Sequence, residues 1–130
     1  MGKQAIVSSR VPPPAGAYSP ALAVGELVFV SGQGGFDPAS GELASDEIEG
    51  QTEQAFRNVE ALLEEAGLSS ADIVSCLVHL SDLSLFSRYN AVYERLLPHE
   101  PRPVRTTVGA QLLAGMLIEL TVIAHRGADA

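Results

Sequence analysis

The chain has 130 residues, of which 46% are hydrophobic and only 5% aromatic, so one folded domain with a mainly aliphatic core is expected. Its net charge of −8 argues against nucleic acid and anionic membrane surfaces as partners, because both bind clusters of Lys and Arg. A lone cysteine excludes an internal disulfide, and the sequence lacks both an apolar signal core and a bilayer-spanning stretch, which indicates a cytoplasmic protein.

Short strands are predicted in the first third of the chain. Ala5–Ser8 is a candidate first strand inside a loop-rich N-terminal segment, residues 1–17, whose consecutive prolines lack N–H donors. Ala21–Val24 and Leu27–Ser31 flank the dipeptide Gly25-Glu26. This pattern predicts a hairpin with a two-residue turn.

A helix is predicted in the middle of the chain. Asp46 and Glu49 have the spacing of a capping box, and apolar residues then recur at helical spacing. Gly67 supplies the usual C-terminal stop.

A strand and a second helix come next. Asp72–Leu80 is almost continuously apolar, which is typical of a buried strand. The second helix is expected to be capped by Asp82 or Ser84 and to end at Pro98.

Two further strands are predicted, near Val104–Gly109 and Leu117–His125. The order predicts an α+β or split βαβ arrangement of about six strands and two helices, in one domain spanning residues 1–130. The strands Asp72–Leu80 and Leu117–Ala124 look apolar on both sides, but two helices cover only one face of a sheet. We therefore expect other subunits to cover the second face.

Arg105 is the first candidate functional residue. It shares one side of its strand with Thr107, while Val104 and Thr106 point the other way. A planar guanidinium can bind a carboxylate through two hydrogen bonds, which Lys cannot do. The alternative is an edge-strand arginine that lies in solvent or in an internal ion pair.

Glu119 is the second candidate, because it interrupts the apolar run Leu117–Ile123. A carboxylate in such a strand is costly unless it has a partner or a function, and it could position or activate a water molecule. The alternative is an exposed position on an otherwise buried strand.

Three further features of the sequence can be explained either by function or by local structure alone. The run Ser31-Gly32-Gln33-Gly34-Gly35 lets a ligand approach the backbone, but it lacks the lysine of a phosphate-binding loop and also fits a plain turn. Tyr18 can offer a hydroxyl from its loop or serve as a rim residue, and Asn90 fits the polar edge of a helix. The histidines show no metal-ligand spacing, so no metal site is predicted.

Several short stretches, in this order and at these separations, are specific to one family. They are Ala17-Tyr18-Ser19-Pro20-Ala21, residues 24–33, residues 37–42, Tyr89-Asn90-Ala91-Val92-Tyr93, Pro103-Val104-Arg105-Thr106-Thr107-Val108 and Ile118-Glu119-Leu120. From Tyr18 to Ala124 the chain resembles the YjgF/RidA family of reactive-intermediate deaminases, also called the endoribonuclease L-PSP family.

The resemblance implies a chorismate-mutase-like (bacillus-type) fold and a homotrimer with active sites in clefts between subunits. It also implies hydrolysis of 2-imino acids and enamines, such as 2-aminoacrylate, to 2-keto acids and ammonia without a metal or cofactor. Arg105 would bind the substrate carboxylate and Glu119 would orient the hydrolytic water. Backbone groups at Gly32 and Thr107 would hold substrate and water, and the cleft would be lined by Tyr18, Ser31 and Asn90.

Two positions depart from the family pattern. Thr107 occupies a position where many members carry Cys, and Gly34-Gly35-Phe36 replaces a bulkier aliphatic-proline pair. The alternative function is a non-catalytic, RidA-like protein that binds small carboxylates or acts in regulation. A ribonuclease, the activity that some relatives are labelled with, is disfavoured by the charge of −8.

Overall fold

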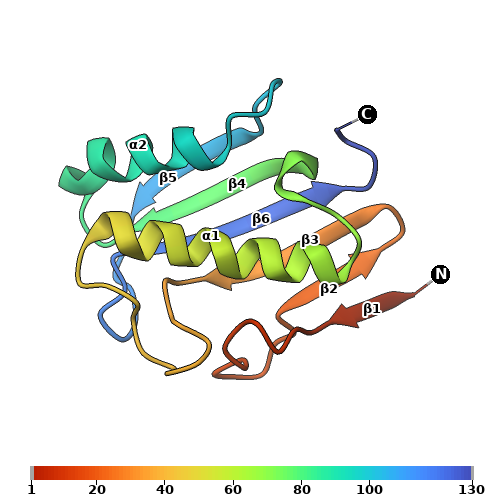
Figure 1. The fold of residues 1–130 in the computed structure, drawn as a ribbon, viewed down its shortest axis with the longest axis horizontal. Helices are drawn as coiled ribbons and strands as arrows, with labels where there is room; N and C mark the ends of the chain where they lie inside the picture. The colour runs from red at the N-terminus through yellow and green to blue at the C-terminus, as the bar shows by residue number, and fades with distance from the viewer. Residues whose placement is uncertain (1, 130) are drawn as a thin grey trace.

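The computed structural model describes residues 2–129 and contains a six-stranded mixed sheet with both α-helices on one face (Figure 1). The strands lie in the order β1-β2-β3-β6-β4-β5, and every pair is antiparallel except β4 with β5. Helix α2 is the crossover that this parallel pair requires. The predicted α+β architecture of six strands and two helices is confirmed. The elements are β1 (Lys3–Ile6), β2 (Ala21–Val24), β3 (Leu27–Gln33), α1 (Ile48–Glu65), β4 (Ile73–Leu80), α2 (Phe86–Leu96), β5 (Val104–Gly109) and β6 (Ile118–His125).

The N-terminal strands are close to the prediction. Gly25 adopts φ +57° in the predicted two-residue turn between β2 and β3. The predicted first strand, Ala5–Ser8, is displaced by two residues, because Ile6 already pairs with Ala21 at the start of β2. The residue before Ala21 is Pro20, which has no N–H to continue the ladder.

Strand β3 extends two residues beyond the predicted Ser31. Its register against β6 shifts between Val30 and Gln33, so that Ser31 and Gly32 together stand opposite Thr121. Such a bulge bends the strand and redirects its side chains. It lies where the candidate site residues of β3 are found.

The predicted capping box of Asp46 and Glu49 is wrong. Helix α1 begins at Ile48, and its N-cap residue makes no side-chain cap. Ser45 acts just before the helix instead: its hydroxyl accepts the N–H of Glu47 at 2.9 Å. A serine hydroxyl that binds the backbone two residues on competes with the expected cap.

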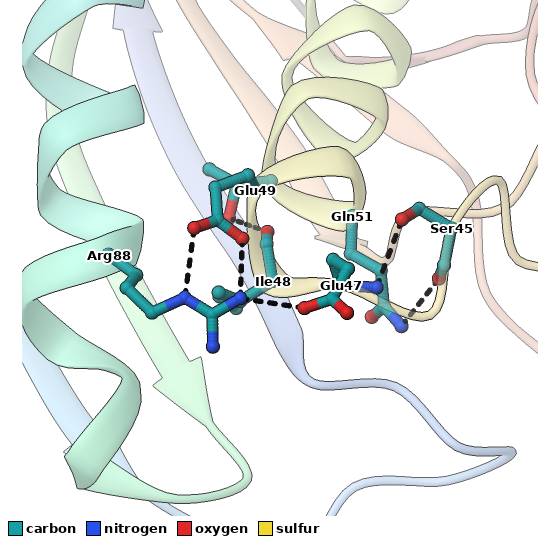
Figure 2. Close-up of polar contacts among 7 residues, drawn as sticks. Ser45, Glu47, Ile48, Glu49, Gln51 and Arg88 are labelled. Atoms are coloured by element: carbon teal, nitrogen blue, oxygen red, sulfur yellow. Dashed lines mark hydrogen bonds and ion pairs between the residues drawn. The ribbon is translucent and has the colours of Figure 1, made fainter.

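Arg88 on α2 connects the two helices near the start of α1 (Figure 2). Its guanidinium donates to both carboxylate oxygens of Glu49 and to Glu47, at 2.7–2.9 Å. The hydrogen bond from Arg88 is the main cause that lowers the pKa of Glu49. Figure 2 also shows the Gln51 side-chain amide donating to the Ser45 carbonyl, at 3.0 Å. The exposed contacts of Arg88 orient the helix ends more than they stabilise the fold.

Two short 3-10 turns change the predicted boundaries. β4 begins at Ile73, because Asp72 belongs to a turn in which its carboxylate accepts the N–H of Ser69 at 2.9 Å. Before α2, the carboxylate of Asp82 accepts the N–H of Ser84 at 2.9 Å. Asp82 is therefore the cap, and the helical turn of residues 83–85 leads into α2.

The predicted stop of α1 is confirmed at Gly67, which has φ +79°. Its N–H donates to the Glu64 carbonyl, and the N–H of Leu68 donates to the Leu63 carbonyl. We expect Gly67→Ala to lower the free energy of unfolding by about 1 kcal/mol, because a side chain is disfavoured at positive φ. Urea unfolding measures the effect, with Gly2→Ala as control, since a Cβ at Gly2 meets no atom within 4 Å. An unchanged midpoint for Gly67→Ala would contradict this account.

One face of the sheet is buried under the helices and the other is open (Figure 1). The open face carries Phe29, Leu77 and Val108, which are 37–38% exposed. It also carries His79 of β4 and Glu119 of β6, so neither strand is wholly apolar on this face. The buried side includes Val28, Val30, Cys76, Val78, Leu80, Ile118, Leu120 and Val122. Within residues 2–129, neither helix could cross a membrane.

Candidate active site

Arg105 lies on the edge strand β5 and points to the helix-covered face. Its register partner on β4 is Cys76, which is paired in turn with Val122 on β6. Both partners are buried beneath the helices. Since paired residues share a face of the sheet, the arginine projects toward α2.

Side chains of helix α2 contact the guanidinium group of Arg105. Its Nη1 donates to Asn90 Oδ1 at 2.7 Å. Its central carbon lies 4.6 Å from the ring centre of Tyr93, 5.4 Å from that of Phe86 and 5.6 Å from that of Tyr89. Contact with aromatic faces stabilises a cation and holds the planar group in place.

Arg105 has no carboxylate partner within residues 2–129. Four other arginines, Arg10, Arg88, Arg95 and Arg102, each pair with a glutamate. The interpretation of Arg105 as one half of an internal ion pair is therefore wrong for the described chain. Its remaining N–H groups can donate hydrogen bonds to an external anion.

The neighbours of Arg105 are themselves held in place. The Asn90 amide nitrogen donates to Glu94 at 3.3 Å, which directs Asn90 Oδ1 toward the arginine. The Thr107 hydroxyl lies 2.8 Å from the Tyr89 hydroxyl. Burial raises the pKa of Tyr89, so the ring stays neutral beside the guanidinium. Thr107, present where many relatives carry Cys, thus has a side-chain contact in addition to the predicted backbone role.

Glu119 points to the opposite, open face of the sheet. Its neighbours on β6, Ile118 and Leu120, are fully buried under the helices, and alternation along the strand turns Glu119 away from them. Its register partner on β4 is His79, whose Nδ1 lies 4.0 Å from Glu119 Oε1.

Gly32 makes room for the Glu119 side chain. A Cβ atom at Gly32 would lie 2.5 Å from Cδ and 2.8 Å from Oε1 of that glutamate. The bulge in β3 therefore brings a bare backbone directly against the carboxylate, and the predicted approach of a ligand to this backbone stays a prediction.

A cleft of about 740 Å³ lies beside this carboxylate. Tyr18, Ser31, Gly32 and Glu119 all line it, so the structure brings these four predicted residues together. Further walls come from residues 12–16, Phe36, Leu113 and Met116. The cleft thus combines one carboxylate with largely apolar walls.

Ser31 and Tyr18 have identifiable local roles. The Ser31 hydroxyl donates to the Ser19 carbonyl at 2.6 Å and fastens the N-terminal loop to β3. The Tyr18 hydroxyl accepts the N–H of Ala15 at 3.2 Å, although the residue is 49% exposed. The loop that borders the cleft is therefore ordered by contacts of the predicted site residues.

The predicted site residues form two groups that a single chain does not bring together. The group on the helix side consists of Arg105, Asn90 and Thr107, and the group in the cleft consists of Tyr18, Ser31, Gly32 and Glu119. In the described part of the chain, no cluster of three or more His, Cys, Asp or Glu side chains could hold a metal ion.

The sequence interpretation missed two features. It did not consider Phe86, Tyr89 and Tyr93 as a group, although three aromatics at successive turns could have indicated a cation partner. It also did not single out His79, whose place beside Glu119 depends on a register between distant strands.

The fold and these two groups describe a small α+β protein in which Arg105 has no carboxylate partner within residues 2–129. The family model described as Endoribonuclease L-PSP matches residues 8–126. A RutC family protein of Pyrococcus abyssi is 39% identical over 127 residues, which cover 97% of this chain and 99% of that protein. The chain belongs to the YjgF/RidA family, also called the endoribonuclease L-PSP family.

Solved structures of relatives share the fold. RidA from the Antarctic bacterium Psychrobacter sp. PAMC 21119 has a TM-score of 0.90 and 40% identity, covering 94% of this chain and 98% of that one. Escherichia coli TdcF, solved with bound serine, has a TM-score of 0.90 and 31% identity, covering 95% and 99%.

Proposed function

We propose that this protein hydrolyses 2-imino acids to 2-keto acids and ammonia, at a site formed by Arg105 of one copy and Glu119 of the next. The observation that carries the proposal is the Arg105 guanidinium, held by Asn90 and aromatic rings but without a carboxylate partner in the described chain. A substrate carboxylate supplies that missing anion.

The proposed reaction requires mainly that the protein position the substrate and the attacking water. An iminium carbon is already electrophilic, so water adds to it once the carboxylate is fixed by Arg105 and the water is oriented by Glu119. Glu119 accepts a proton from the water as the C–O bond forms and returns it to the nitrogen. The C–N bond then breaks, ammonia leaves, and the hydroxyl proton is lost as the carbonyl forms.

The positions of Arg105 and Glu119 on opposite sides of the sheet support a site that is shared between two copies. Arg105 lies on the edge strand β5 and Glu119 faces the opposite side, so an adjacent copy is needed to supply the second group. The apolar side chains on the open face give such a copy a surface to cover. We propose the homotrimer of the family as this assembly.

One relative supports a second candidate function. TdcF was solved with serine, an amino acid rather than an imine. A non-catalytic protein that binds small carboxylates through Arg105 fits the same contacts.

The test generates 2-iminobutyrate or 2-iminopropionate in situ with an amino-acid oxidase and traps the remaining imine with semicarbazide. We expect the wild-type protein to accelerate imine loss. If folded protein accelerates none of several imines, the deaminase proposal fails. Calorimetric titration with serine and 2-ketobutyrate then tests the binding alternative.

The shared site has a separate test. Chains carrying Arg105→Ala and chains carrying Glu119→Ala are unfolded, mixed in equal amounts and refolded together. In a cyclic trimer, roughly a quarter of the interfaces then combine an intact arginine with an intact glutamate, so about that share of wild-type activity should return. Inactivity of the mixture, with light scattering showing mixed trimers, would contradict a site shared between copies.

A further inference from the structure

We infer that His79 is a positioning residue for Glu119, whose carboxylate it holds through its Nδ1–H group. The inference rests on the proposed deaminase function and adds to it a residue that the family pattern did not bring forward. His79 acts through Glu119 and needs no contact with the substrate.

The two side chains face each other across paired strands. His79 on β4 is in register with Glu119 on β6 and with Val108 on β5, so the three share one row on the open face. Nδ1 lies 4.0 Å from Glu119 Oε1, and the two side chains are 27% and 31% exposed. A small rotation of either side chain brings the atoms to hydrogen-bond distance.

His79 Nδ1 needs such a partner. The atom is buried and makes no hydrogen bond within the described residues. A buried polar nitrogen without a partner is destabilising, whereas an N–H donor beside a carboxylate forms a strong, charge-assisted bond. A hydrogen bond to Glu119 would remove this cost and fix the carboxylate at the same time.

Few other ionisable groups surround Glu119. β3 presents the bare backbone of Gly32, and β5 contributes the apolar Val108 to the row. Tyr18 lines the same cleft, but its hydroxyl is engaged with Ala15. In the proposed assembly, Arg105 of the neighbouring copy faces the site as well. Within one described chain, His79 is therefore the group placed to orient the Glu119 carboxylate.

A measurable consequence follows from this placement. A hydrogen bond to a carboxylate fixes the orientation of its oxygens. Without the donor, the Glu119 carboxylate no longer holds the water in position. kcat must then fall while KM, which depends on Arg105, stays nearly unchanged.

The test compares His79→Phe, which keeps a ring but removes the donor, with His79→Asn, which places an amide N–H near Nδ1. We expect His79→Phe to lower kcat about tenfold at neutral pH. KM should change little, because Arg105 is intact. His79→Asn should restore most of the loss, and Ser75→Ala, a partly buried position on the same strand, should leave kcat unchanged. An unchanged kcat in folded His79→Phe would overturn the inference.

NMR on the wild-type protein separates this inference from the deaminase proposal. Nitrogen-15 shifts of the imidazole should show Nδ1 protonated, and the carbon-13 chemical shift of the Glu119 carboxyl should change in His79→Phe. If both hold but no imine is hydrolysed, the pair stands and the deaminase proposal fails. If Nδ1 is unprotonated in the wild type, the inference about His79 is overturned, whether or not the protein deaminates and whether or not the variants fold.

Discussion

Arg105→Ala is expected to lower kcat/KM for a 2-imino acid by about a thousandfold. In the proposed mechanism the substitution removes the cation that binds the substrate carboxylate, and loss of one partner of a buried, hydrogen-bonded charge pair costs about 2–5 kcal/mol. At about 1.4 kcal/mol per tenfold change, the upper part of that range gives the expected loss. The measurement is the rate of imine loss in the coupled oxidase assay at several imine concentrations.

Graded variants separate charge from geometry at this position. Arg105→Lys keeps the charge but donates from a single point, so it should recover part of the activity. Asn90→Ala leaves the guanidinium intact but removes its 2.7 Å partner, and KM should rise more than kcat falls. The control is Arg57→Ala, an exposed arginine on α1. Wild-type kinetics in folded Arg105→Ala would exclude the assigned role.

Gly32→Ala is expected to lower kcat about a hundredfold while leaving the fold nearly as stable as before. The added Cβ would overlap the end of the Glu119 side chain, at 2.5–2.9 Å from Cδ, Oε1 and Cγ. That end is flexible, so it swings aside and the backbone stays in place. The displaced carboxylate can no longer orient water, and the general-base contribution is lost.

Gly32→Ala should affect the reaction rate much more than the stability of the fold. Thermal unfolding should shift little, whereas the single-turnover rate should fall. Gly2→Ala is the matched control, because a Cβ there meets no neighbouring atom. Full activity in Gly32→Ala would mean that Glu119 does not need its present orientation, and a large loss of stability would mean that the bulge itself requires glycine.

Much of the fold could be predicted because local signals and tertiary packing agree. The turn at Gly25 and the stop at Gly67 both need positive φ, and glycine marks such positions in the sequence. The start of α1 was missed because Ser45, Asp46 and Glu49 offer competing caps, and only the folded chain decides among them. The start of β1 depended on the partner strand, which its own residues do not reveal.

The site residues could be named from the sequence, but not their arrangement. Alternation within β5 placed Arg105 and Thr107 on one side, and the structure agrees. Whether that side is also the side of Glu119 depends on the register of β4 with both β5 and β6. Those pairings join residues far apart in the chain, so sequence spacing could not show that Arg105 and Glu119 face opposite ways.

That opposition has a consequence for how the protein works at low abundance. If each site needs Arg105 from one copy and Glu119 from another, an isolated chain contains both residues but cannot form a complete site. Catalytic output per chain is then governed by mass action and falls when the protein is diluted below the dissociation constant of its assembly. The concentration of the protein, rather than any change within the folded chain, would switch such a site on or off.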